Sequence, residues 1–438
     1  MFGLFKKSKS PKTTTAQRQT RTLKVSLACP DETFLQRYAS LVQKAFVQTP
    51  LVQIECTCIL ADENQTQNNF FDLWDTGLKI LKQQKADVLI LLFEEKNQIK
   101  IMFQKENMYE PEKKFFFSFV STLFLPPAYF EENKFPKQIA EIITGAVLSL
   151  MVKQDKAFLT SLQQIVSQLE KEKMPTGLEN LQIAYVLNML AVVYLSAQET
   201  LSVPQGKTLL SIFKSAFNLA EKANEQTLLG CLYIGLSTLY ETVAVNEKTE
   251  TSVYFNHALE TLLQAKRYFN KFVHPYDYGY LSGKIAELYF TLFAHVEDLT
   301  YLREGIFHLR QAEKIFTMLA HPYIWADIQG KIAHYLSILG QRTDNAEIKQ
   351  LSIENYKNRQ RVYTKENKPF MWANIEACIA DTYYHLGKLT KDETFLEEAA
   401  ECYTQALEVY EQEGAVSEAN QMKDCLAKTE KLLKSADF

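Results

Sequence analysis

The chain has 438 residues, which is too long for a single hydrophobic core, so at least two structural units are expected. Apolar residues make up 47% of the sequence, while Gly and Pro number only 14 and 12, a balance typical of a mostly helical globular protein. The formal net charge of -4 offers no basic excess to neutralise phosphates, which argues against nucleic acid as a partner.

Residues 1–21 are rich in Lys, Ser and Thr without periodicity, and are predicted to form a disordered basic leader. The first apolar residues are too few for the core of a signal peptide, so none is expected. Two interpretations of the leader remain open. It could be a solubilising tail, or it could make a weak contact with a membrane surface through Phe2, Leu4 and Phe5 beside basic residues.

Residues 22–135 are predicted to form a small α/β domain. Helical spacing over residues 32–47 and 70–84 alternates with β-rich runs at residues 23–28, 52–60, 87–93, 99–103 and 115–120. Alternation at the start predicts a parallel sheet, and the adjacent runs joined through residues 94–98 predict an antiparallel extension. The element order is similar to that of small α/β domains at the amino-termini of some bacterial envelope-associated proteins.

Nothing in the sequence indicates catalysis. The one glycine of residues 22–135, Gly77, lies in a helical pattern, which argues against a phosphate-binding loop. Seven cysteines are scattered without a CxxC pair, so no metal site is expected, and they are interpreted as reduced thiols of a cytoplasmic protein. Cys56 and Cys58 would share one face of a strand as a buried pair. No cofactor is predicted.

Residues 136–174 are predicted to form two connecting helices, ending before Pro175 and Gly177. A small residue, two residues of any type and an aromatic or Leu then recur at spacings of 46 to 49 residues. The copies are Ala191/Tyr194, Ser237/Tyr240, Ala286/Tyr289, Ala333/Leu336 and Ala380/Tyr383. Pro275, Pro322 and Pro369 recur at intervals of 47 residues. A fixed period of this size indicates stacked structural repeats.

This pattern resembles the first helix of a tetratricopeptide repeat, and Ala399, Tyr403 and Ala406 resemble the pattern of its second helix. The 47-residue unit is longer than the family's usual length and is similar to a variant found in many bacterial repeat proteins. The length also falls in the range of HEAT repeats, but the residue pattern favours the tetratricopeptide family. The resemblance implies a mainly α fold, an α-solenoid of five helical hairpins over residues 175–415, preceded by the small α/β domain.

The ends of the predicted helices follow from Pro and Gly. Proline at the first turn marks helix starts, and Gly340 and Gly387 after Leu are predicted to end first helices. Extended turns such as residues 387–395 would then carry the extra residues of each unit. Residues 416–438 repeat only a first helix with a Lys- and Glu-rich exterior, and are predicted to form a C-terminal capping helix.

Tetratricopeptide arrays bind partners through a concave groove lined by their first helices. The resemblance places these residues in that groove: Tyr185, Asn188, Glu241, Tyr280, Glu287, Phe290, Asp327, His334, Asn374, Asp381 and Tyr384. Members that bind a C-terminal carboxylate use Lys, Arg and Asn there, and only Asn188 fits. Because the groove positions carry four acids and no Lys or Arg, they predict a basic peptide with apolar anchors as ligand.

The sequence therefore predicts a non-enzymatic interaction scaffold that binds a peptide or protein through the concave face of its repeats. An alternative gives the α/β domain a regulatory or enzymatic role, with the repeats as its targeting module. A third hypothesis is a structural oligomer in which repeats stack between chains.

Overall fold

The structure is a computed structural model that describes residues 20–29, 32–60, 77, 79–105, 122–131, 134–152, 155–198, 203–246 and 250–435. Nearly all of the predicted leader thus lies outside the described residues. The chain divides into two compact units. The first comprises Met1–Glu106 and Ser121–Gln198, and the second comprises Asn107–Val120 and Glu199–Phe438.

The first unit contains a five-stranded sheet with strand order β2-β1-β3-β4-β5. Its strands are β1 (Arg21–Cys29), β2 (Val52–Leu60), β3 (Val88–Glu95), β4 (Gln98–Gln104) and β5 (Thr122–Leu125). β1 pairs in parallel with β2 and β3, and β4 pairs antiparallel with β3 and β5. The predicted parallel start and antiparallel extension are confirmed.

A tight turn joins β3 to β4. Lys96 and Asn97 both have positive φ angles, of 52° and 59°, so the backbone twist of the turn matches that of the flanking strands. The β-rich run predicted at residues 115–120 lies outside the described residues, and β5 begins at Thr122. Of the helix predicted over residues 70–84, residues 77 and 79–84 are described.

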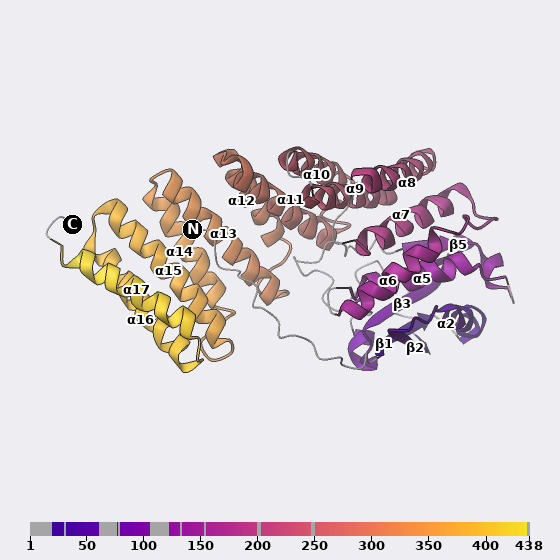
Figure 1. Cartoon of the computed structure of the whole chain (residues 1–438), viewed down its shortest axis with the longest axis horizontal. Coiled ribbons are helices and arrows are strands. Elements are labelled where there is room, and N and C mark those ends of the chain that lie inside the picture. Colours follow the sequence, from indigo (N-terminus) through magenta and orange to yellow (C-terminus); the bar gives the residue numbers. More distant parts are fainter. Residues whose placement is uncertain are drawn as a thin grey trace. The chain divides into compact units, whose positions relative to one another are not determined.

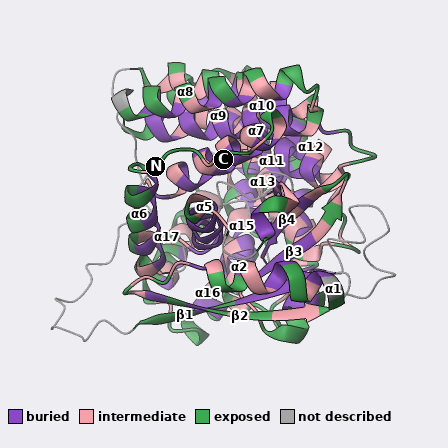
Figure 2. Ribbon diagram, turned by 90° about the vertical axis from the view of Figure 1, so that its right-hand side faces the viewer, coloured by how far each residue is buried: buried purple, intermediate pink, exposed green. Residues whose placement is uncertain are grey.

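Helices pack against this sheet and against one another. They are α1 (Glu32–Phe34), a π-helical turn (Leu35–Ala39), α2 (Ser40–Ala45), a 3-10 turn (Pro127–Phe130), α5 (Lys137–Ser149), α6 (Lys156–Leu169) and α7 (Asn180–Ser196). α5 is buried along most of its length, as its colour in Figure 2 shows. α7 packs on α5, α6 and β5, so the first helix of the repeat pattern belongs to the first unit.

The second unit is entirely helical in its described residues, and successive helices lie side by side (Figure 1). The helices are α8 (Val203–Lys222), α9 (Gln226–Asn246), α10 (Thr251–Lys266), α11 (Pro275–Val296), α12 (Leu299–Glu313), α13 (Pro322–Arg342), α14 (Ala346–Gln360), α15 (Pro369–Thr390), α16 (Glu393–Gln412) and α17 (Val416–Leu433). This is the predicted mainly α, tetratricopeptide-like arrangement of stacked hairpins, preceded in the chain by a small α/β domain.

Small residues allow the helices to approach closely. Ala286, Ala333 and Ala380, at the same position of successive repeats, have no exposed surface. A Cβ atom added to Gly305 of α12 would collide with the ring of Phe290 on α11, so only glycine fits there. The aromatic residue fills the space that the small residue leaves, as the repeat pattern predicted.

The predicted helix starts are confirmed, whereas the predicted helix ends were wrong. Pro275, Pro322 and Pro369 each occupy the first turn of a helix. Gly340 and Gly387, however, lie inside α13 and α15, which continue to Arg342 and Thr390. The extra residues of each unit therefore lengthen the helices, and only short turns remain before α14 and α16.

Gly340 and Gly387 serve packing rather than helix termination. An added Cβ on Gly340 would lie 2.8 Å from Cγ of Lys349, and one on Gly387 would lie 2.8 Å from Cδ2 of Leu396. Each glycine thus faces the following helix at close range. The residues that do adopt the left-handed conformation at these helix ends are Glu297, Asp344 and Lys391, one in each of three successive repeats.

One helix of the described residues, α9, is long and apolar enough to cross a membrane. In the structure, 72% of its most apolar window is buried within the protein. α9 packs between α8 and α10. Its apolar character is therefore accounted for by its position as an inner helix of the stack.

Candidate partner-binding pocket

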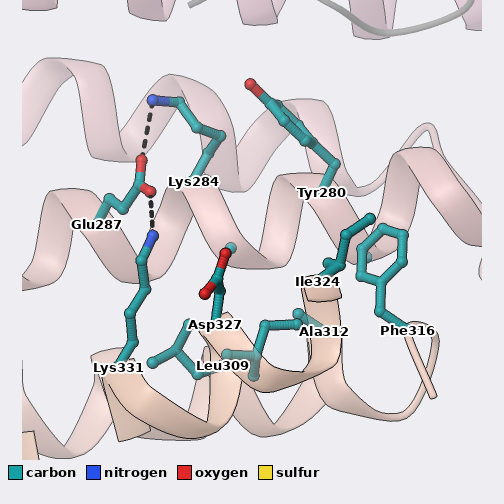
Figure 3. A pocket seen from close by; sticks show the side chains of 12 residues that line it. Tyr280, Lys284, Glu287, Leu309, Ala312, Phe316, Ile324, Asp327 and Lys331 are labelled. Carbon is teal, nitrogen blue, oxygen red and sulfur yellow. Dashed lines mark hydrogen bonds and ion pairs between the residues drawn. The ribbon is translucent and has the colours of Figure 1, made fainter. Parts of the chain in front are cut away.

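A pocket lies between α11, α12 and α13 of the second unit (Figure 3). It offers about 40 Å³ of space. Its lining residues are Gly279, Tyr280, Gly283, Lys284, Glu287, Leu309, Ala312, Phe316, Ile324, Asp327, Ile328 and Lys331. At roughly 10–15 Å³ for each water molecule, the space suits about three waters or the tip of one side chain. It is too small for a cofactor.

The walls of the pocket are apolar. Leu309 and Phe316 are buried core residues contributed by α12 and the loop after it, and Ile328 on α13 is also buried. Gly283 leaves the pocket open, because a Cβ atom added there would meet no other atom within 4 Å. Gly279, one turn earlier on α11, has the opposite role, since its Cβ would lie 2.8 Å from the ring of Phe316.

Three charged side chains form an ion-pair ladder along one side of the pocket. The carboxylate of Glu287 accepts from Nζ of Lys284 at 3.0 Å and from Nζ of Lys331 at 2.7 Å (Figure 3). The Lys284 side chain is 13% exposed and the Lys331 side chain 34% exposed. The ladder joins α11 to α13, that is, one repeat to the next.

The surroundings shift the pKa values of the ladder. Burial opposes the ionised form of Glu287, but the charges of Lys284 and Lys331 outweigh it and lower the pKa of Glu287. Burial alone would lower the pKa of Lys284, yet Glu241 and Glu287 raise it above its ordinary value. Both groups are therefore charged at neutral pH. Glu241 on α9 contributes its charge to this cluster across the neighbouring repeat.

Asp327, one helical turn before Lys331 on α13, is also paired. One of its oxygens lies 3.4 Å from a guanidinium nitrogen of Arg359 and accepts from the Tyr363 hydroxyl at 3.1 Å. Together with the ladder, this corrects the expectation of an acidic face without cations. Lys284, Lys331 and Arg359 lie directly beside the predicted acids and neutralise much of their charge.

Asp381 lies farther along the array, on α15, and accepts a hydrogen bond from the hydroxyl of the buried Tyr403. The surrounding protein partly shields the Asp381 carboxylate from water, which raises its pKa. The hydrogen bond from Tyr403 partly offsets this increase. The carboxylates of Asp327 and Asp381 each accept from a buried tyrosine, so replacement by Lys would disturb packing as well as charge.

Of the other predicted groove residues, four are buried: Tyr280, which lines the pocket, and three core side chains. Tyr185 and Asn188 belong to α7 of the first unit, where the ring of Tyr185 packs on Phe124 with centroids 4.7 Å apart. Phe290 is buried and stacks on the ring of Tyr335. These side chains stabilise the fold and present no surface to a partner.

The remaining predicted residues lie outside the pocket on the first helices of the repeats: Glu241, His334, Asn374, Asp381 and Tyr384. Asn374 accepts a hydrogen bond from the Tyr410 hydroxyl at 2.8 Å, and the ring of His334 contacts Tyr335 edge to face. The structure thus brings only Tyr280, Glu287 and Asp327 of the predicted set together in one pocket.

The pattern of one repeat did not identify the cations or the apolar walls. Lys284 and Lys331 occupy the same position in successive repeats, 47 residues apart, so the alignment of repeats contained a signal for them. Leu309, Ala312 and Phe316 come from the second helix and the loop that follows it. Their contribution depends on how the next repeat packs, which a pattern within one unit does not give.

Elsewhere in the described residues, no group of three or more His, Cys, Asp or Glu side chains is arranged to hold a metal ion. Cys56 and Cys58 lie on β2, an edge strand of the sheet, and are half-buried rather than buried as expected. The thiol of Cys58 donates to Oε1 of Gln43 at 3.6 Å. A hydrogen bond with Cys56 lowers the pKa of Cys58 to about 7, despite partial burial.

No protein-family model matches the chain. No curated protein matches it either. Among solved structures, the chain is similar to a signal transduction ATPase with numerous domains (STAND) that has a tetratricopeptide repeat sensor, from Pyrococcus horikoshii. The identity is 12% and the TM-score 0.39, and the match covers 68% of this chain but only 43% of that protein.

Proposed function

We propose that this chain is a non-enzymatic interaction scaffold that binds an extended segment of a partner protein along the first helices of its repeats. One apolar side chain of the partner would enter the pocket between α11, α12 and α13. The observation that carries this proposal is the pocket itself, in which apolar walls meet an oriented set of charges. Binding sites of this composition take an apolar anchor and fix its orientation through a few polar groups.

The size of the pocket limits the anchor. A space of about 40 Å³ admits the end of a Leu, Ile or Met side chain but no complete cofactor. Gly283 is the residue that keeps the entrance open, since nothing lies within 4 Å of where its Cβ would be. The anchor would contact Leu309 and Ile328 and pass beside Tyr280.

The charges around the pocket limit the partner's polarity. Two lysines and two carboxylates line it, so their formal charges cancel, and Glu241 adds a negative charge nearby. We therefore propose a partner with an apolar anchor and a modest preference for a basic flanking residue, which Asp327 could accept. The Asp327 side chain is 40% exposed and is the most accessible acid of this group.

The proposal places the protein in the cytoplasm. None of the seven cysteines, including the pair on β2, is joined in a disulfide, which is consistent with a reducing compartment. The alternative of a regulatory or enzymatic first unit has no supporting metal-binding cluster among the described residues.

The test uses the full chain and a library of displayed peptides. Peptides selected on the wild-type protein are measured against Gly283→Phe, whose ring would fill the pocket, and against Gly283→Ala as the matched control. We expect the Phe variant to lose at least about tenfold in affinity, as loss of an anchor site does, and the Ala variant to bind within about threefold. Equal affinity of a correctly folded Phe variant would show that peptides bind elsewhere.

A further inference from the structure

The helices of the second unit are joined by two sets of loops, and one set has an unusual composition. Residues 267–274, 314–321 and 361–368 connect α10 to α11, α12 to α13 and α14 to α15. Because successive hairpins stack in register, these three loops follow one edge of the array, called here the inter-repeat edge. The loops are 47 residues apart and occupy equivalent positions.

Large apolar side chains project from this edge. Phe272 is 80% exposed and Leu319 is 97% exposed, and the two hold the same position in successive repeats. Val273 beside Phe272 is 57% exposed. Tyr323 and Phe370, in the first turns of α13 and α15, are exposed as well. Apolar side chains that gather on an exposed edge in this way mark a surface that contacts a partner or a membrane.

Cations surround these apolar tips. The three loops hold six Lys or Arg residues and a single acid, Glu366, in a chain whose net charge is -4. Arg267, Lys314 and Arg361 cap the ends of α10, α12 and α14, where the helix dipole favours a positive charge. That explanation does not extend to three further exposed cations beyond the helix ends: Lys271, Lys365 and Lys368.

The opposite edge has the reverse charge. The loops after α11, α13 and α15 contain Glu297, Asp298, Asp344 and Asp392 against a single cation, Lys391. Over these three repeats the charge is thus segregated between the two edges, whereas the shorter inter-repeat loops at either end of the unit, residues 223–225 and 413–415, each carry one acid and no cation. Segregation of this kind orients a protein toward an anionic surface.

We propose that the inter-repeat edge docks on an anionic lipid bilayer. Phe272 and Leu319 would insert among the head groups, while the surrounding cations would contact lipid phosphates. Exposed aromatic and aliphatic side chains among Lys and Arg are the combination that interfacial binding requires, since neither apolar insertion nor charge attraction suffices alone. Nζ of Lys271 lies 4.9 Å from the centre of the Phe272 ring, which places the cation and the apolar group side by side.

This inference does not depend on the proposed peptide binding, because none of the exposed edge side chains named above lines the pocket. The two activities can therefore be tested separately on the same full-length protein.

The experiment measures co-sedimentation of the full chain with phosphatidylcholine vesicles, with and without phosphatidylglycerol. We expect binding only to the anionic vesicles, weakened by added salt. The double variant Phe272→Asp with Leu319→Asp should bind at least about tenfold more weakly, because it removes the inserting groups and adds repulsion. Val296→Asp is the matched control, since Val296 is 53% exposed on the opposite edge, and it should bind like the wild type.

Three results would overturn the proposal. The wild-type chain could fail to bind anionic vesicles. The double variant could bind as well as the wild type, which would assign binding to another segment such as residues 1–19. The double variant could lose binding to a single-stranded oligonucleotide while vesicle binding stays unchanged, which would make the edge a nucleic-acid surface.

Discussion

Glu287 on α11 and Lys331 on α13 form an ion pair of 2.7 Å that spans one repeat of the array. Lys284 completes the pair from the other side, at 3.0 Å from the same carboxylate. The central acid therefore holds two cations that would otherwise repel each other beside an apolar pocket. Its removal leaves the less exposed of them, Lys284, without its closest partner.

We expect Glu287→Gln to destabilise the second unit by about 1–2 kcal/mol at neutral pH, less than for a fully buried pair because the ladder is partly exposed. The lowered pKa of Glu287 means that its contribution is complete above the ordinary carboxyl value of 4.5. It is lost as the pH falls through the folded-state pKa. Urea denaturation across this range measures the difference.

Glu408→Gln on the exposed face of α16 is the control and should change the free energy of unfolding by less than about 0.5 kcal/mol. If Glu287→Gln had no larger effect than this control at neutral pH, the ladder would be a surface contact without energetic weight. The same result would remove the basis for orienting a ligand by these charges.

Gly279 and Gly283 give a matched pair of substitutions on one helix. Gly283→Ala should stabilise the protein by about 0.5–1 kcal/mol, because alanine favours the helix and its Cβ meets nothing. Gly279→Ala should destabilise it, because its Cβ would be forced against Phe316 and Ile315. Thermal unfolding of both variants tests this. A loss of stability in Gly283→Ala would mean that the pocket is closed in solution.

Much of the fold followed from the sequence because the repeat pattern reports helix packing directly. Ala286, Ala333 and Ala380 are small where two helices cross, and each is fully buried as expected. The role of the glycines was harder to predict. The local sequence Leu386-Gly387 is the same whether the glycine ends a helix or packs against Leu396 of the next helix. That choice is made by the neighbouring helix and not by the local sequence.

The candidate site was predicted less completely than the fold. Tyr280, Glu287 and Asp327 share a pocket, as their repeat positions indicated. The charges that pair with them come from a neighbouring turn, a neighbouring repeat or a second helix: Lys284, Lys331 and Arg359. Such pairings depend on the rise and rotation from one repeat to the next, for which a single sequence carries no measure.

Asp381 offers a prediction of opposite sign to that for Glu287. Its raised pKa means that ionisation opposes folding, so stability falls as the pH rises through the folded-state pKa. Asp381→Asn keeps an acceptor for the Tyr403 hydroxyl without the charge. At neutral pH we expect this variant to match the wild type in stability or to exceed it by less than about 1 kcal/mol. The gain should shrink as the pH falls toward 3.8, the ordinary pKa of an Asp carboxyl.

Asp381→Lys is the contrasting substitution. It removes the acceptor and adds a cation where Tyr403 is buried, and it should destabilise the fifth repeat. Equilibrium unfolding in urea distinguishes the two variants. Should Asp381→Asn prove clearly destabilising at neutral pH, the carboxylate would have to be stabilised by its surroundings, and its pKa would be lowered instead.

Cys58 should be the most reactive of the described thiols. Its hydrogen bond with Cys56 lowers its pKa to about 7, whereas burial raises the pKa of Cys231 well above the usual value. Alkylation of the full chain by iodoacetamide, followed residue by residue with mass spectrometry, should give a rate for Cys58 that is half-maximal near pH 7. Cys56→Ala removes the hydrogen bond and should shift this midpoint toward 9.0. An unchanged midpoint in Cys56→Ala would show that the two thiols on β2 do not interact, and labelling of Cys231 as fast as Cys58 would contradict the expected order of reactivity.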